Sequence, residues 1–181
     1  EEAYAEAKSI AEMGFQHILL LTGDAPKLSS PEYIASVARR IKPLFASVGV
    51  EVYSLTVEEY SLLVEAGVDS MTMFQETYNP ELYAWLHPVG PKHDYGFRLN
   101  APERAARAGM RSLGVGALLG LESFEQDAFG TGLHAWWLQR NFPGVDVSVS
   151  IPRICPHEGD FDVQHAVDDR HLVQYVTATR C

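Results

Sequence analysis

Short β-rich runs alternate with helical segments along the whole chain, and this alternation constrains the fold more than any other feature. His17–Leu21 is almost continuously apolar, which is typical of a strand buried on both faces. We expect five strands in all, at residues 17–21, 50–55, 70–74, 113–119 and 145–151. Strands that are spaced by helices indicate parallel β–α–β units and not a β-sandwich. The sequence therefore predicts the α/β class.

Capping residues, prolines and glycines mark the helices between these strands. Ser30 before Pro31 is typical of a helix start, and Thr56 with Glu59 has the spacing of a capping box. The expected helices cover residues 2–13, 30–46, 56–67, a short stretch from 79, 100–109, 123–141 and 168–179. Pro43 is expected to kink the second helix or to end it early. A loop is expected at 88–95, which is rich in Gly, Pro and His.

Five strand–helix units in 181 residues suit part of a (β/α)₈ barrel, which needs about 250 residues when whole. A doubly wound sheet is the alternative, although no GxGxxG follows the first strand. We expect a partial TIM-type barrel of parallel strands with outer helices, in a single domain over residues 1–181. The chain starts without Met inside one helical pattern and stops after another, and so we expect a fragment.

Composition excludes several classes of protein. The 14 Lys and Arg residues against 24 Asp and Glu residues give a net charge of −10, which argues against a nucleic-acid partner. The longest apolar runs are too short to span a bilayer. Cys155 and Cys181 have no CxxC spacing, which favours a reducing, cytoplasmic compartment. The histidines show no metal-ligand spacing, and we predict no metal site from them.

Polar groups and glycines follow most of the predicted strands, at the carboxyl ends where parallel α/β folds carry their chemistry. They occur at residues 22–24, 75–78, 114–116, 120–122 and 148–153. Each of these groups alone also suits a turn, a helix cap or strand packing. Together they could hold an amphoteric small molecule with an amine, a carboxylate, a diol and an aromatic ring.

Four segments resemble the aromatic-amino-acid lyases of the radical S-adenosylmethionine superfamily, above all the tyrosine lyases of thiamine thiazole biosynthesis. They are AEMGFQHILLLTGD (11–24), FQETYNPELYAWLHPVGPKHDYGFRL (74–99), RAGMRSLGVGALLGL (107–121) and SVSIPRICP (148–156). The block at 74–99 is the specific part of this resemblance, which extends over essentially the whole chain.

The resemblance implies a radical enzyme built on a (β/α) barrel. In this family a reduced [4Fe–4S] cluster cleaves S-adenosylmethionine to a 5′-deoxyadenosyl radical, and the protein supplies position and a dry cavity. The radical starts Cα–Cβ cleavage of tyrosine to p-cresol and 2-iminoacetate. The implied partners are tyrosine or a related aromatic amino acid, an electron donor such as flavodoxin or ferredoxin, and thiazole synthase.

The resemblance also implies roles for particular residues. Those implied to bind S-adenosylmethionine are Thr22, Gly23, Asp24, Glu76, Arg98, Gly116 and Leu121. The segment at 22–24 would receive the methionyl ammonium, although its Asp is shorter than the family's usual Glu. Glu76 would lie near the ribose or amino-acid end, Arg98 would pair with the carboxylate, and 116–121 would contact the adenine.

Substrate binding is implied for Gln75, Ser150 and Arg153, with Arg153 and Ser150 at the carboxylate of the amino acid. The family's CxxxCxxC loop is absent from this sequence and would lie just before Glu1. The five strands would then be strands two to six of the barrel. We expect the chain alone to bind no cluster, to be inactive, and to self-associate through its open sheet edges.

Three alternatives remain open. The hydrogenase-maturation tyrosine lyases share the block at 74–99 and differ from the thiamine enzymes beyond the end of this sequence. Outside the superfamily, a cluster-free barrel lyase or a small-molecule binding module would also account for the polar strand ends.

Overall fold

Five parallel strands form one sheet in the computed structural model, which describes residues 1–155 and 161–180. The strands follow one another across the sheet in sequence order, without a reversal. They are β1 (His17–Leu21), β2 (Ser47–Glu51), β3 (Ser70–Phe74), β4 (Ser112–Gly116) and β5 (Asp146–Val149). The predicted α/β class and parallel sheet are confirmed, and the strand order is that of a barrel segment and not of a doubly wound sheet.

Three strands differ from their predicted bounds. β2 begins and ends earlier than the expected 50–55, because the buried residues Val52, Tyr53 and Leu55 belong to the connection after the strand. An apolar run alone does not separate a strand from a buried loop. β4 ends at Gly116, and Leu119 makes an isolated bridge to Arg153. β5 is shorter than the expected 145–151.

The helices match most of the predicted segments. They are α1 (Glu2–Glu12), α2 (Pro31–Ile41), η1 (Lys42–Leu44, a 3₁₀ turn), α3 (Val57–Glu65), α4 (Pro80–Leu86), α5 (Tyr95–Leu99), α6 (Ala101–Ala108), α7 (Phe124–Asn141) and α8 (Asp169–Ala178). The capping box of Thr56 and Glu59 is present, and Ser30 caps α2. None of the helices in the described ranges has the length and apolar character of a membrane span.

The segment at 94–100 was predicted wrongly. Asp94 caps the unexpected helix α5 by accepting a hydrogen bond from the backbone N–H of Phe97. Asn100 follows α5 directly, and its side-chain amide donates to the carbonyl of Gly96 instead of capping α6. Pro156 and Cys181, which the sequence patterns include, lie outside the described residues.

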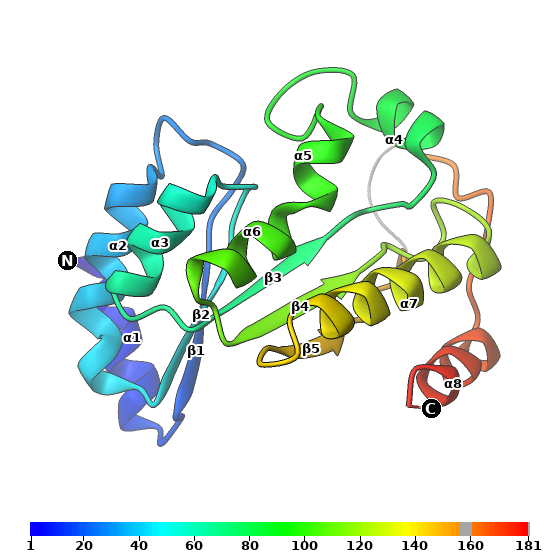
Figure 1. Ribbon diagram of the computed structural model, residues 1–181. Helices are drawn as coiled ribbons and strands as arrows, with labels where there is room; N and C mark the ends of the chain where they lie inside the picture. The colour runs from blue at the N-terminus through cyan, green and yellow to red at the C-terminus, as the bar shows by residue number, and fades with distance from the viewer. Residues whose placement is uncertain (156–160, 181) are drawn as a thin grey trace.

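The two faces of the sheet differ in chemistry. One face packs against α1, α2, α3, α6 and α7 through a single hydrophobic core, as the arrangement in Figure 1 shows. The strand residues in this core are Val48, Val50, Met71, Met73, Leu113 and Val115. The opposite face carries small or polar residues on the middle strands, while Leu19 and Leu21 of β1 and Phe74 of β3 add apolar side chains to it. A Cβ atom at Gly114 would lie 2.6 Å from Oγ1 of Thr72, and one at Gly49 would lie 2.7 Å from Oγ of Ser70.

The amino ends of the strands are joined by the carboxylate of Asp69. Its oxygens accept hydrogen bonds from Oγ of Ser47 at 2.6 Å and Nζ of Lys42 at 3.1 Å, and Arg111 lies 3.4 Å away. Burial acts to raise the pKa of Asp69, but the bonds from Ser47 and Lys42 outweigh it and leave the pKa lowered. Asp69 therefore links η1, β2 and β4 at the edge opposite to the predicted site.

Replacing Asp69 with Asn should remove part of the acid sensitivity of the fold. A carboxyl group whose pKa is lowered by folding stabilises the folded state at pH values above its pKa in the unfolded chain, which is about 3.9 for Asp. This stabilisation is lost as the pH falls through the pKa of the folded state. Asp69→Asn should cost roughly 1–3 kcal/mol of unfolding free energy at pH 7 and little near pH 2, measured by urea unfolding. Exposed Asp146→Asn is the control, and equal pH profiles for wild type and Asp69→Asn would contradict the assignment.

The two edges of the sheet are β1 and β5. Edge strands carry backbone groups that can pair with another chain. Self-association through these edges stays a prediction.

Candidate functional site

A polar cavity of about 300 Å³ lies at the carboxyl ends of β1, β2 and β3. Five of the predicted ligand-binding residues line it, namely Thr22, Gly23, Asp24, Glu76 and Arg98. Leu21, Glu51, Val52, Thr72, Met73, Phe74 and Lys92 complete the lining. The strand-end groups at residues 22–24 and Glu76 therefore meet in one place, because parallel strands direct their carboxyl ends to the same edge, and Arg98 joins them from the helix Tyr95–Leu99.

Glu76 stands between two cations in this cavity. Its Oε1 atom accepts hydrogen bonds from Nζ of Lys92 at 2.7 Å and from Nη2 of Arg98 at 3.2 Å. Lys92 also approaches Oδ2 of Asp24 at 3.5 Å. Arg98 is buried and donates from Nε to the carbonyl of Phe74 at 2.8 Å, which fixes its guanidinium against the end of β3. Salt bridges in such a shielded place are screened less than surface pairs.

Glu51 is a third carboxylate in the cavity, and it was not predicted. Burial raises the pKa of Glu51 and the neighbouring Glu76 raises it further, while Arg98 and Lys92 act to lower it. The expected strand at 50–55 placed Glu51 inside a strand. The observed β2 ends at Glu51, which brings its carboxylate to the functional edge.

Lys92 was also missed as a site residue, because it lies in a loop that no periodicity describes. Its backbone carbonyl accepts a hydrogen bond from the hydroxyl of Tyr83 at 2.6 Å. Tyr83 is fully buried in α4, and burial raises the pKa of its phenol to about 12, so that the hydroxyl stays protonated and can donate. Lys92 belongs to the block at 74–99, and that resemblance was the signal that could have identified it.

Gly116 lies next to the cavity without lining it. A Cβ atom there would lie 2.5 Å from the carbonyl oxygen of Ser150 and 3.2 Å from the ring of Phe74, a lining residue. The absence of a side chain therefore lets β4 and the segment after β5 approach each other. Leu121 follows in the connection to α7, away from the cavity lining.

The predicted substrate residues lie outside the cavity lining as well. Nη1 of Arg153 pairs with Oδ1 of Asp169 at 2.7 Å and donates to the carbonyl of Val167 at 3.2 Å. The side-chain amide of Gln75 is buried, and neither of its polar atoms has a hydrogen-bond partner within the described part of the chain. The structure thus brings the predicted cofactor residues together more closely than the predicted substrate residues.

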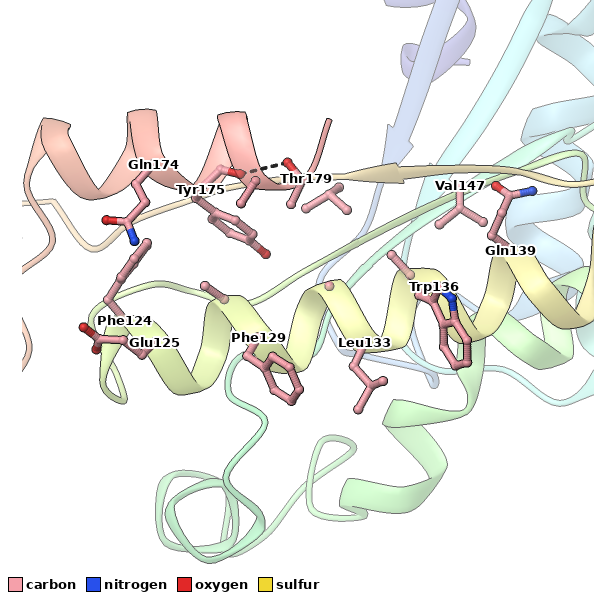
Figure 2. A pocket seen from close by; sticks show the side chains of 15 residues that line it. Phe124, Glu125, Phe129, Leu133, Trp136, Gln139, Val147, Gln174, Tyr175 and Thr179 are labelled. Atoms are coloured by element: carbon pink, nitrogen blue, oxygen red, sulfur yellow. Dashed lines mark hydrogen bonds between the residues drawn. The ribbon is translucent and has the colours of Figure 1, made fainter. Parts of the chain in front are cut away.

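A larger cavity of about 930 Å³ lies between α7, β5 and α8 and is of a different kind (Figure 2). Phe124, Phe129, Leu133, Trp136 and Tyr175 contribute to a mainly apolar wall. Glu125 is the one charged residue among those that line it. Without converging charged groups, this groove does not have the character of a catalytic site.

Comparison with known proteins decides the family. The profile of the Radical SAM superfamily matches residues 1–128. The chain belongs to the radical SAM superfamily. It is 36% identical to 2-iminoacetate synthase of Escherichia coli over 176 residues, which cover 97% of this chain and 47% of that protein. The corresponding enzyme of Salmonella typhimurium is 35% identical with the same coverage. The chain thus spans about half the length of the curated relatives that it matches.

Solved structures agree with this membership. HydG, a maturase of the [FeFe]-hydrogenase, superposes with a TM-score of 0.92 at 30% identity, over 99% of this chain and 42% of that one. Methylornithine synthase (PylB) has a TM-score of 0.68 at 18% identity, over 98% of this chain and 51% of that one, and supports the fold alone. The radical SAM family implies S-adenosylmethionine and a [4Fe–4S] cluster.

The 300 Å³ cavity has the chemistry to hold S-adenosylmethionine. Carboxylates suit its ammonium and sulfonium, and the cations Arg98 and Lys92 suit its carboxylate. The buried hydroxyl of Thr22 has no hydrogen-bond partner among the residues described, and this leaves it for a ligand.

The cluster does not fit the residues present. The sequence has two cysteines where three thiolates are needed. Nor does the described part of the chain gather three potential metal-binding side chains.

Proposed function

We propose that residues 1–181 form the central part, strands two to six, of the barrel of a radical SAM carbon–carbon lyase. It cleaves the Cα–Cβ bond of tyrosine to give 2-iminoacetate and p-cresol for thiamine thiazole synthesis, or the same bond of a related aromatic amino acid. The convergence of Asp24, Glu76, Lys92 and Arg98 on one cavity carries this proposal. The 36% identity to 2-iminoacetate synthase over 97% of the chain supports the choice of lyase.

In the intact protein, S-adenosylmethionine and a [4Fe–4S] cluster held by other residues would supply the radical chemistry of this family. In our proposal the segment at 22–24 binds the methionyl ammonium and Arg98 binds the carboxylate. Glu76 binds near the ribose, and the backbone at 116–121 meets the adenine. The buried position of Arg98 supports its role, since a guanidinium binds a carboxylate strongly where water is excluded.

The substrate would lie beside this site, against the small and polar face of the sheet. Thr72, which lines the cavity, and Gly114, which packs against Thr72, are small residues, so this part of the face has little side-chain bulk. Gln75, Ser150 and Arg153 are the residues proposed to bind the amino acid. The ion pair of Arg153 with Asp169 supports a carboxylate-binding role, provided that the substrate carboxylate takes the place of Asp169.

The remaining requirements lie outside these 181 residues. The cluster thiolates would come from a CxxxCxxC segment elsewhere in the intact protein, and flavodoxin or ferredoxin would supply the electron. Thiazole synthase would receive the product, in the cytoplasm. The isolated chain would be inactive.

A hydrogenase-maturation tyrosine lyase is the second candidate, and the TM-score of 0.92 with HydG favours it. Both candidates would cleave tyrosine, so the fate of the two-carbon fragment separates them. Release of free 2-iminoacetate would support the thiamine-type enzyme.

Anaerobic reconstitution of the intact protein tests the proposed reaction. With iron, sulfide, reductant, S-adenosylmethionine and tyrosine, we expect p-cresol and 5′-deoxyadenosine to form together, quantified by chromatography and mass spectrometry. Reactions without tyrosine or without reductant are the controls. Formation of 5′-deoxyadenosine with no p-cresol, or cleavage of an unrelated amino acid, would contradict the assigned substrate.

Arg98→Ala should weaken binding of S-adenosylmethionine by about 2–5 kcal/mol, because it removes the cation paired with the ligand carboxylate and leaves Glu76 with one partner fewer. Isothermal titration calorimetry on the reconstituted protein measures this change. Arg107→Ala is the control, since exposed Arg107 pairs with Glu103 on α6 and should not affect binding. An unchanged affinity in a folded Arg98→Ala protein would remove Arg98 from the site.

A further inference from the structure

We infer that one face of α7, formed by Asp127, Gly130 and His134, positions Glu76 in the cavity by holding the turn that follows β3. These residues are spaced by three and four positions and so share one side of the helix. None of them lines the 300 Å³ cavity, and they act on it through Thr77 and Tyr78. The inference rests on the proposed function for what Glu76 binds, but not for how Glu76 is held.

The backbone at Glu76 needs such support. Its φ angle is +70°, and no other non-glycine residue in the described ranges has a positive φ. A side chain with a Cβ atom adopts this left-handed region at an energetic cost and stays there when its surroundings determine it. On the sheet side, the carbonyl of Glu76 accepts from the N–H of Leu118 at 2.8 Å, and the N–H of Gln75 donates to Gly116 at 2.8 Å.

Asp127 holds the other side of the turn. Its carboxylate is fully buried, and Oδ1 accepts from the hydroxyl of Thr77 at 2.9 Å and from the backbone N–H of Tyr78 at 2.7 Å. Both donors belong to the two residues directly after Glu76. Burial raises the pKa of Asp127, while these two hydrogen bonds act against that rise. The carboxylate thus anchors the backbone immediately beyond the strained residue.

Gly130 and His134 extend the same contact by one and two turns of α7. A Cβ atom at Gly130 would lie 2.6 Å from Cγ of Tyr78, so the tyrosine packs directly on the helix backbone. The hydroxyl of Tyr78 lies 2.9 Å from Nδ1 of His134. Burial lowers the pKa of His134 to about 4 and raises that of Tyr78, so this bond joins two neutral groups at pH 7. Tyr78 is therefore fixed at its backbone, its ring and its hydroxyl.

Two glycine substitutions on the same helix test this role with matched chemistry. Gly130→Ala places a methyl group against Tyr78, whereas a Cβ atom at Gly132 meets nothing within 4 Å. The first readout needs no ligand. It is the coupling free energy between Glu76 and Lys92, measured in the intact protein by a double-mutant cycle of Glu76→Gln and Lys92→Met on the free energy of unfolding. We expect this coupling to vanish in the Gly130→Ala background and to persist in the Gly132→Ala background.

The second readout is affinity for S-adenosylmethionine in the reconstituted intact protein. Gly130→Ala and Asp127→Leu should weaken it about ten- to a hundredfold, since small displacements of a positioned group have effects of this size. Asp127→Asn keeps an oxygen that accepts from Thr77 and Tyr78 and should restore both coupling and affinity. A residue that contributed to stability alone would change the unfolding midpoint and leave both readouts unchanged.

The outcomes separate this inference from the proposed function. Intact coupling in a folded Gly130→Ala chain, or lost coupling in Asp127→Asn, would overturn the role of α7. If Gly130→Ala does not fold, the comparison of Asp127→Leu with Asp127→Asn decides the same question. A wild-type protein that shows the expected coupling pattern but binds no S-adenosylmethionine would refute the proposed function and leave the role of α7 standing.

Discussion

Parallel pairing of five strands in sequence order is the constraint on which the rest of the molecule depends. It sends every carboxyl end to one edge, so that residues far apart in the sequence meet there. Covering helices occupy one face, and the middle strands keep small and polar side chains such as Gly49, Thr72 and Gly114 on the other face. The cavity at the carboxyl edge follows from these two conditions.

Charged residues have different roles at the amino ends and at the carboxyl ends of the strands. At the amino edge, Asp69 ties η1, β2 and β4 together and serves the fold. At the carboxyl edge, Glu76 ties the end of β3 to Lys92 and Arg98, which come from the segment between β3 and β4. That second cluster carries three carboxylates and two cations in a small cavity, an arrangement suited to a zwitterionic ligand.

The sequence predicted the class of fold, the centres of the strands and most helix starts, because burial periodicity and capping are local signals. The strand ends read from these signals place Thr22, Gly23, Asp24 and Glu76 in one cavity, whereas Arg98 was predicted from the family resemblance alone. Glu51 was not predicted as a site residue because the buried apolar residues after β2 extend the apolar pattern of the strand, and so the strand was expected to end later than it does.

Other parts could not be predicted from local patterns. Lys92 reaches Glu76 through a loop whose path depends on the buried hydroxyl of Tyr83. Asp127 contacts a turn about fifty residues earlier in the chain, and nothing in its own helix distinguishes it from an acidic residue near a helix start. Helix α5 was not predicted because Asp94, which caps it, lies in a segment whose prolines and glycines indicated a loop. Contacts between residues distant in the sequence decided the cases of Lys92 and Asp127, whereas the cap of α5 is local.

A crystal structure of the intact protein with S-adenosylmethionine bound would show whether the ligand occupies the cavity at the carboxyl ends of the strands. We predict ligand density beside Thr22, Asp24, Glu76 and Arg98, with the methionyl carboxylate at the guanidinium of Arg98. Ligand density in the apolar groove between α7 and α8, or a ligand bound too far from Glu76 to contact this residue or its ion-pair partners, would contradict this prediction.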